Sequence, residues 1–172
     1  MNKQVWIEKA LGLGIQEFEI YQSTTVEKEM TWFQGQMDTL VSSKVTGTSI
    51  RGIVDGKMAN MALEEIDDSM CETVLKSLIE QAHIISNEET DSLRKPEPIE
   101  YAKKDVTWNM ASTEYVKDIL QSLEAKILAY DPRVIQVGYL GYSQGSGSRS
   151  IVNSLGMDVQ DADEMQYIVA SV

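Results

Sequence analysis

The sequence is poor in the residues that form most nucleophilic and metal-dependent active sites. Its 172 residues include one cysteine, Cys71, and one histidine, His83. A single cysteine cannot form an internal disulfide, which fits a reducing compartment. A catalytic zinc site needs about three protein ligands, two of which usually come from one short motif, and no such motif is present. We therefore expect no catalytic residue, no metal ligand and no cofactor in this chain.

Positive charge and long apolar segments are also scarce. Lys and Arg number 15 against 27 Asp and Glu, so the formal net charge is −12. Such a charge repels nucleic acid and the anionic face of a membrane. No apolar run approaches the ~18 residues of a membrane span, and no signal core follows Met1. These features predict a cytoplasmic protein that has neither nucleic acid nor a membrane as a partner.

The N-terminal half has the pattern of one helix followed by strands. Apolar residues at helical spacing predict a helix over 5–11, and β-branched and aromatic residues then predict four or five strands between 18 and 63. Gln34-Gly35 is expected to form a turn. Asp55-Gly56 suits a two-residue hairpin turn, because both residues tolerate positive φ.

Two amphipathic helices are predicted further along the chain. One has an apolar stripe over 70–82 after a capping Asp67 or Asp68, and the other begins near Ser112 with a stripe over 116–127. Between them, Pro96 and Pro98 exclude a regular helix, so 86–105 is interpreted as a connector.

After the second helix, we expect three strands. Segments 134–142 and 149–153 should form a hairpin around the Gly/Ser-rich loop 143–148, and another strand should begin at Tyr167. The acidic stretch 158–164 is interpreted as a solvated loop, since it lacks the spacing of a calcium loop.

Strands that follow one another through tight turns favour antiparallel pairing. The predicted fold class is α+β, with an antiparallel or mixed sheet packed against two main amphipathic helices plus a short N-terminal helix. We expect a single domain over 1–172. Because the last residues, 167–172, read as an interrupted strand, we also expect a fragment of a longer chain.

Each isolated reactive residue has a plain structural interpretation. His83 is expected to be a half-buried residue near a helix end, and Cys71 a small residue packed in the first turn of a helix. Ser154 lacks the first glycine of a nucleophile elbow and is interpreted as a turn residue. These residues form no complete active site, so they predict an α+β domain and no specific function.

Several segments together resemble the N-terminal domain of the PmbA/TldD family, known as proposed modulators of DNA gyrase and as metalloproteases. The resemblance spans nearly the whole chain and is closer to the PmbA type than to the TldD type. The matching segments are Glu19-Ile20-Tyr21, Gln34-Gly35-Gln36, 47–59 with its Asp55-Gly56-Lys57 turn, Glu80-Gln81-Ala82, Asp131-Pro132-Arg133-Val134 and the Asn153-Ser154-Leu155-Gly156 turn.

The resemblance implies a function that this chain does not complete. Family members cleave unfolded peptides as homodimers or as heterodimers with a TldD-type subunit. The His-Glu-x-x-x-His helix of TldD-type members lies beyond the region matched here, and PmbA-type members commonly lack it and act as the partner subunit. Zinc would therefore be held by a missing C-terminal domain or by the partner subunit. The chain is expected to contribute to the peptide-binding cleft and the dimer. The alternative is a non-catalytic binding or assembly module of a peptidase-like partner subunit.

A peptidase for unfolded peptides can hold its substrate as an added strand on an exposed sheet edge. Two segments are candidate edges, 30–33 and 57–61. In the second, Met58, Ala59 and Met61 form the candidate peptide-binding edge, because methionine side chains adapt to varied neighbours. The competing interpretation places these residues in the core or in the dimer contact.

Overall fold

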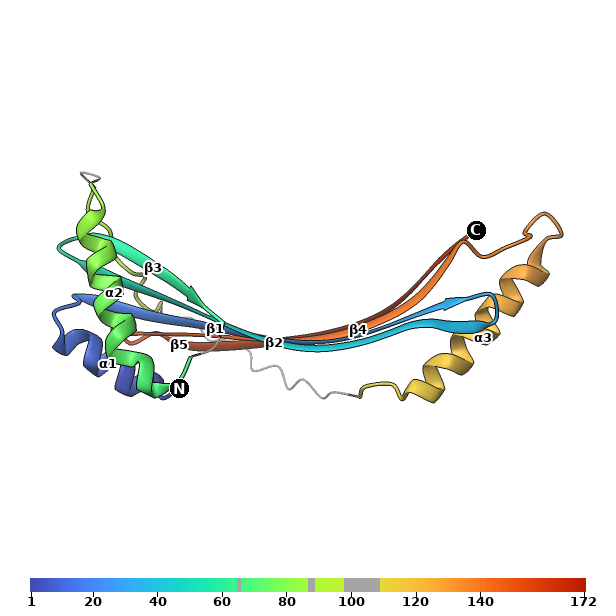
Figure 1. Ribbon diagram of the computed structural model, residues 1–172, viewed down its shortest axis with the longest axis horizontal. Helices are drawn as coiled ribbons and strands as arrows, with labels where there is room; N and C mark the ends of the chain where they lie inside the picture. Colours follow the sequence, from blue (N-terminus) through green and yellow to red (C-terminus); the bar gives the residue numbers. More distant parts are fainter. Residues whose placement is uncertain (65, 87–88, 98–108) are drawn as a thin grey trace. The chain divides into compact units, whose positions relative to one another are not determined.

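The computed structural model describes residues 1–64, 66–86, 89–97 and 109–172 (Figure 1). Helix and strand order confirms the α+β class, and the five strands form one antiparallel sheet in the order β3-β2-β1-β4-β5. The elements are α1 (Lys3–Gly12), β1 (Glu17–Phe33), β2 (Gln36–Val54), β3 (Lys57–Leu63), the 3-10 helix η1 (Asp68–Met70), α2 (Cys71–Ile84), α3 (Thr113–Tyr130), β4 (Tyr139–Asn153) and β5 (Asp158–Ser171).

Both predicted two-residue turns are confirmed, and their backbone angles explain why. Gln34 and Asp55 have φ of 49°, and the glycines that follow them have φ of 79° and 74°. Positive φ at both central positions matches the twist of the flanking strands. The β2–β3 hairpin therefore closes with Val54 opposite Lys57.

The helix starts also follow the sequence pattern. The Ser112 hydroxyl accepts the N–H of Tyr115 at 3.1 Å and caps α3. Asp67 accepts the N–H of Ser69 at 2.7 Å and so caps η1, whereas α2, which begins at Cys71 directly after η1, has Met70 at its N-cap position and no side-chain cap. Of the described helices, none combines the length and apolar character that crossing a membrane would require.

The strands are fewer and longer than predicted. β1 is continuous over 17 residues and β2 over 19, where the sequence pattern had suggested separate shorter runs. The joining segments are rich in threonine and serine, whose side chains pair across the strands: the Thr24 and Thr46 hydroxyls are 3.0 Å apart. Polar residues can therefore continue a strand when both neighbours bond to it.

The Gly/Ser-rich loop predicted at 143–148 is wrong, because these residues lie inside β4. β4 pairs with β1 on one side and β5 on the other, so its backbone groups are satisfied in the extended state. The glycines leave room for neighbouring side chains, since a Cβ on Gly147 would lie 2.6 Å from Asp163 Oδ1. The hairpin turn comes instead at Ser154–Gly156.

The solvated loop predicted at 158–164 is likewise wrong. These residues form the first half of β5, which was expected to begin at Tyr167. They are mostly exposed, which explains why their composition resembles that of a loop. An edge strand has one side open to water and tolerates such charge.

The described residues group into two compact units. Unit 1 comprises 1–24, 46–104 and 148–161, and unit 2 comprises 25–45, 105–147 and 162–172. In unit 1, α1 and α2 pack on the sheet around Phe18, Ile20, Ile50, Leu75 and Leu78. In unit 2, α3 packs on the sheet around Met30, Trp32, Val116, Leu120 and Leu140. The predicted stripes of both helices thus pack on strands, each in its own core.

The predicted connector 86–105 is described over 86 and 89–97, which contain no helix or strand. Its remaining residues lie outside the described ranges. The described part belongs to unit 1, where Leu93 is buried.

Candidate functional site

The isolated reactive residues take structural positions. Cys71 is buried at the start of α2, and burial raises the pKa of its thiol, which disfavours a reactive thiolate. His83 is exposed rather than half-buried, with Nε2 3.7 Å from Asp55 Oδ2. Ser154 lies in the predicted turn, where its hydroxyl accepts the N–H of Phe18 at 2.9 Å.

A protein metal site needs about three ligand side chains close together. Across the part of the chain that the structure describes, no three His, Cys, Asp or Glu side chains gather into a group that could hold an ion. The described residues therefore do not fit the catalytic zinc of a metallopeptidase. Where zinc would be held stays a prediction.

Of the two candidate edges, 57–61 lies at the edge of the sheet and 30–33 does not. β3 is the terminal strand beside β2, whereas β1, which contains 30–33, pairs with β2 on one side and β4 on the other. The prediction that 30–33 is a free edge is therefore wrong. Only a tertiary pairing with β4, a strand more than a hundred positions away in sequence, closes that side of β1.

The register of the hairpin shows which backbone groups of β3 face outward. In a two-residue hairpin the closing pair, here Val54 and Lys57, is hydrogen-bonded, and bonded pairs alternate with non-bonded pairs from there. Ala59 and Met61 therefore direct their N–H and C=O groups toward Gly52 and Ile50 of β2.

The outward backbone groups belong to the alternate residues, Met58, Asn60 and Ala62. The N–H of Met58 donates to Asp91 Oδ2 at 3.1 Å. Within the described ranges, no residue bonds to the outward groups of Asn60 or Ala62, and both residues are exposed. Of the three predicted edge residues, Met58 thus has an outward N–H. The side chains of Ala59 and Met61 lie on the face of the sheet that α2 covers, and Ala59 is buried there.

A polar cluster lies on the other face of the sheet from α2. Arg51, opposite Asn60 in the register, donates through Nε to Glu19 Oε1 at 3.0 Å. The second oxygen of Glu19 accepts from Asn153 Nδ2 at 3.3 Å. Glu19 is 2% exposed, so its charge is balanced inside the cluster while part of Arg51 stays in contact with water. The cluster joins β1, β2 and β4 just beside the open edge.

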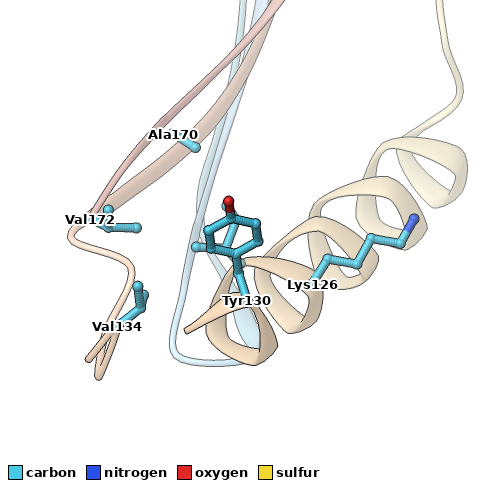
Figure 2. A pocket seen from close by; sticks show the side chains of 6 residues that line it. Lys126, Tyr130, Val134, Ala170 and Val172 are labelled. Atoms are coloured by element: carbon cyan, nitrogen blue, oxygen red, sulfur yellow. The ribbon is translucent and has the colours of Figure 1, made fainter. Parts of the chain in front are cut away.

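Unit 2 contains an open apolar pocket of about 400 Å³ between the C-terminal half of α3 and the end of β5 (Figure 2). Its walls are Lys126, Ile127, Tyr130, Val134, Ala170 and Val172. Figure 2 shows the Tyr130 ring standing between α3 and β5, with the Lys126 amine directed away from Val172. The pocket therefore offers apolar contact rather than a placed charge.

The chain matches two sequence models of one family. Residues 18–86 match PmbA/TldA metallopeptidase domain 1, and residues 107–172 match the PmbA/TldA metallopeptidase central domain. No curated protein sequence matches the chain.

Solved structures with the same fold include a proposed modulator of a DNA gyrase from Thermotoga maritima, with a TM-score of 0.82 and 18% identity over 98% of this chain. TldE from Thermococcus kodakarensis has a TM-score of 0.80 and 19% identity over 98% of this chain. A proposed modulator of DNA gyrase from Bacteroides thetaiotaomicron has a TM-score of 0.72 and 17% identity over 96% of this chain. This chain covers 38% of the length of each of these neighbours.

Proposed function

Because this chain belongs to the PmbA/TldA metallopeptidase family, we propose that it forms part of the peptide-binding cleft of a peptidase or peptidase-like subunit. In this proposal the substrate is an unfolded peptide, and it docks on the outer edge of β3. The observation that supports it is the pair of exposed residues, Asn60 and Ala62, whose backbone groups face away from β2.

Backbone pairing suits a substrate of varied sequence. An extended peptide on a sheet edge gains its affinity from main-chain hydrogen bonds, which every residue except proline can make. β3 supplies two outward positions for such bonds, at Asn60 and Ala62. The partly buried side chains of Met58 and Met61 flank them and can adapt to different peptide side chains.

The proposal extends to assembly with a second subunit. Since one of the structural neighbours carries the name TldE, the fold is compatible with a subunit of a two-chain assembly. We propose a homodimer, or a heterodimer with a TldD-type subunit, in which zinc is held outside this chain. A PmbA-type role and a cytoplasmic location belong to the same proposal.

The test compares two proline substitutions that differ by one residue. Asn60→Pro removes an outward N–H and leaves the β2–β3 hydrogen bonds in place, so the fold should persist. Ala59→Pro removes an N–H that bonds to Gly52 and should disrupt the hairpin. Binding of a fluorescently labelled unstructured peptide to the 172-residue chain is measured by polarisation, and folding by circular dichroism.

We expect Asn60→Pro to stay folded and to lose most peptide binding. Ala62→Pro is the matched second variant, since it removes the next outward donor. If folded Asn60→Pro and Ala62→Pro both bind the peptide as the unmodified chain does, β3 is not the docking edge. Zinc analysis and peptide cleavage by the chain mixed with a TldD-type subunit then separate a peptidase subunit from a non-catalytic assembly module.

A further inference from the structure

We propose that Asp91 occupies the first position of the β3 docking edge and thereby sets how long a peptide the edge accepts. The inference rests on the proposed function above and concerns a residue outside the edge strand itself. Asp91 would be a positioning residue: it contacts the strand where a peptide would otherwise begin to pair.

Asp91 bonds to β3 as a residue of a neighbouring strand would. Its backbone N–H donates to the carbonyl of Gly56 at 2.9 Å. Its carboxylate Oδ2 accepts the outward N–H of Met58 at 3.1 Å. A donor and an acceptor from one residue thus satisfy two successive outward groups of the hairpin, which is the pattern of an added strand. The side-chain oxygen takes the place of the carbonyl that a peptide would offer.

Neighbouring contacts with β3, β1 and β4 hold this segment against the sheet independently of the Asp91 carboxylate. On one side, Lys57 Nζ donates to the carbonyl of Glu89 at 3.1 Å. On the other side, the N–H of Leu93 donates to Glu17 Oε2 at 2.6 Å, and the Leu93 side chain is 5% exposed. The carbonyl of Arg94 accepts from Asn153 Nδ2 at 2.9 Å. Removing the carboxylate should therefore open one backbone position without releasing the segment.

Three outward positions exist along β3, at Met58, Asn60 and Ala62, and Asp91 fills the first. Successive outward positions are about 7 Å apart, so each one pairs with about two peptide residues. With Asp91 in place, a peptide can pair at Asn60 and Ala62 and gains nothing from additional residues toward Met58. Without the carboxylate, a longer peptide gains a further position.

The experiment measures peptide length dependence in two variants. The probes are alternating Ser-Val peptides of about six and about ten residues, acetylated and amidated so that no terminal charge contributes, and binding to the full 172-residue chain is followed by competition polarisation. Asp91→Ala removes the acceptor of Met58. Asp91→Asn keeps an oxygen acceptor at the same place and serves as the matched control.

We expect Asp91→Ala to raise the affinity for the longer peptide about tenfold and to leave the shorter peptide unchanged, because the Met58 N–H becomes available for one further backbone hydrogen bond. Asp91→Asn should bind both peptides as the unmodified chain does. Amide exchange at Met58 should become faster in Asp91→Ala alone. A purely structural role for Asp91 would change both peptides by the same factor, and that result, or no change in either, overturns the inference.

The two sets of variants separate failure of the Asp91 proposal from failure of the proposed docking edge. If Asn60→Pro abolishes binding while Asp91→Ala shows no length effect, the docking edge stands and the role of Asp91 is rejected. If Asn60→Pro leaves binding of both peptides intact, or neither variant nor the unmodified chain binds either peptide, the docking edge is rejected and the role of Asp91 with it.

Discussion

Unit 1 and unit 2 are built from the same long strands but are covered differently. β1, β2, β4 and β5 contribute residues to both units. In unit 1 two helices, α1 and α2, pack against the sheet, and Trp6, Phe18 and Leu75 are fully buried between them. Among the described residues of unit 2, α3 is the helix that covers the strands.

The two units also differ on the sheet face opposite the helices. In unit 1 it carries the Glu19–Arg51–Asn153 cluster, and the buried Leu93 donates its N–H to Glu17 there. Along unit 2, side chains alternate between the faces, so Tyr139 points away from the α3 core that contains Leu140. By the same alternation, residues of β5 next to the pocket-lining Ala170 face outward.

Outward apolar side chains in unit 2 are correspondingly exposed. The exposed fractions are 42% for Tyr139, 46% for Tyr167 and 46% for Val169. Apolar residues in a strand thus do not by themselves guarantee a buried face. A sheet face is buried where the chain supplies a covering layer, and the described residues supply two layers in unit 1 and one in unit 2.

The largest expected effect is the loss of a leucine from either core. Leu78→Ala in unit 1 and Leu120→Ala in unit 2 should each lower the free energy of unfolding of their unit by about 2–5 kcal/mol, since both side chains are fully buried. Leu78 should cost more, because it packs so closely on Gly52 that a Cβ there would lie 2.7 Å from Leu78 Cδ2. Amide exchange in each unit measures the two effects separately. Changes below ~0.5 kcal/mol in both variants would contradict the assignment of the cores.

Removing the buried carboxylate of each unit should have the next largest effect. Glu19→Ala removes the acceptor of Arg51 Nε and one of the two acceptors of Asn153 Nδ2, and it should cost unit 1 about 2–3 kcal/mol. Glu124→Ala removes the acceptor of Trp32 Nε1, at 2.9 Å, and of the Gly35 N–H, at 3.0 Å, and should cost unit 2 about 1–3 kcal/mol.

Tryptophan fluorescence can assign these losses when Trp108 and one of the other two tryptophans are replaced by phenylalanine, which leaves Trp6 as the probe of unit 1 or Trp32 as the probe of unit 2. In urea titrations, Glu19→Ala should shift the Trp6 transition more than the Trp32 transition, and Glu124→Ala the reverse. Equal shifts of both transitions in both variants would show that the units unfold together.

A smaller effect is expected on the uncovered face of unit 2. Val169→Thr should change stability by less than ~0.5 kcal/mol, because the side chain is already 46% exposed. The matched change in unit 1, Ile20→Thr, places a hydroxyl in a fully buried position and should cost more than ~2 kcal/mol. Thermal unfolding of both variants tests the contrast, and a large loss in Val169→Thr would mean that the face is covered.

The smallest effect concerns pH. The backbone N–H of Asn2 and then the Trp6 indole donate to Asp68 and hold the pKa of its carboxyl below the usual 3.8. A lowered folded-state pKa contributes stability that is present above about pH 4 and is lost as the pH falls through the folded value. Trp6 fluorescence should therefore change at acid pH, and Asp68→Asn should abolish that change. An unaltered acid transition in Asp68→Asn would exclude this hydrogen bond as its source.

Local sequence chemistry determined the elements whose cause lies within a few residues. Asp55-Gly56 forms the predicted hairpin because positive φ is a property of those two residues. The helices α2 and α3 follow their apolar stripes, and Ser112 caps the second of them through its own hydroxyl. These features, and the family resemblance that depends on the same short motifs, were predictable from the sequence.

The tertiary structure alone decided which strands have free edges and which faces are covered, because both depend on partners far away in the chain. The glycines of β4 are extended only because β1 and β5 pair with their backbone N–H and C=O groups on both sides. The same pairing between β1 and β4 makes 30–33 part of an internal strand. The direction of each N–H on β3 follows from the pairing register and not from the amino-acid composition. The N–H of Asn60 therefore faces outward, and that of Ala59 faces β2. The hydrogen bond between Asp91 and Met58 had no sequence signal at all, because it joins a carboxylate to an N–H group 33 residues earlier that β2 leaves unpaired.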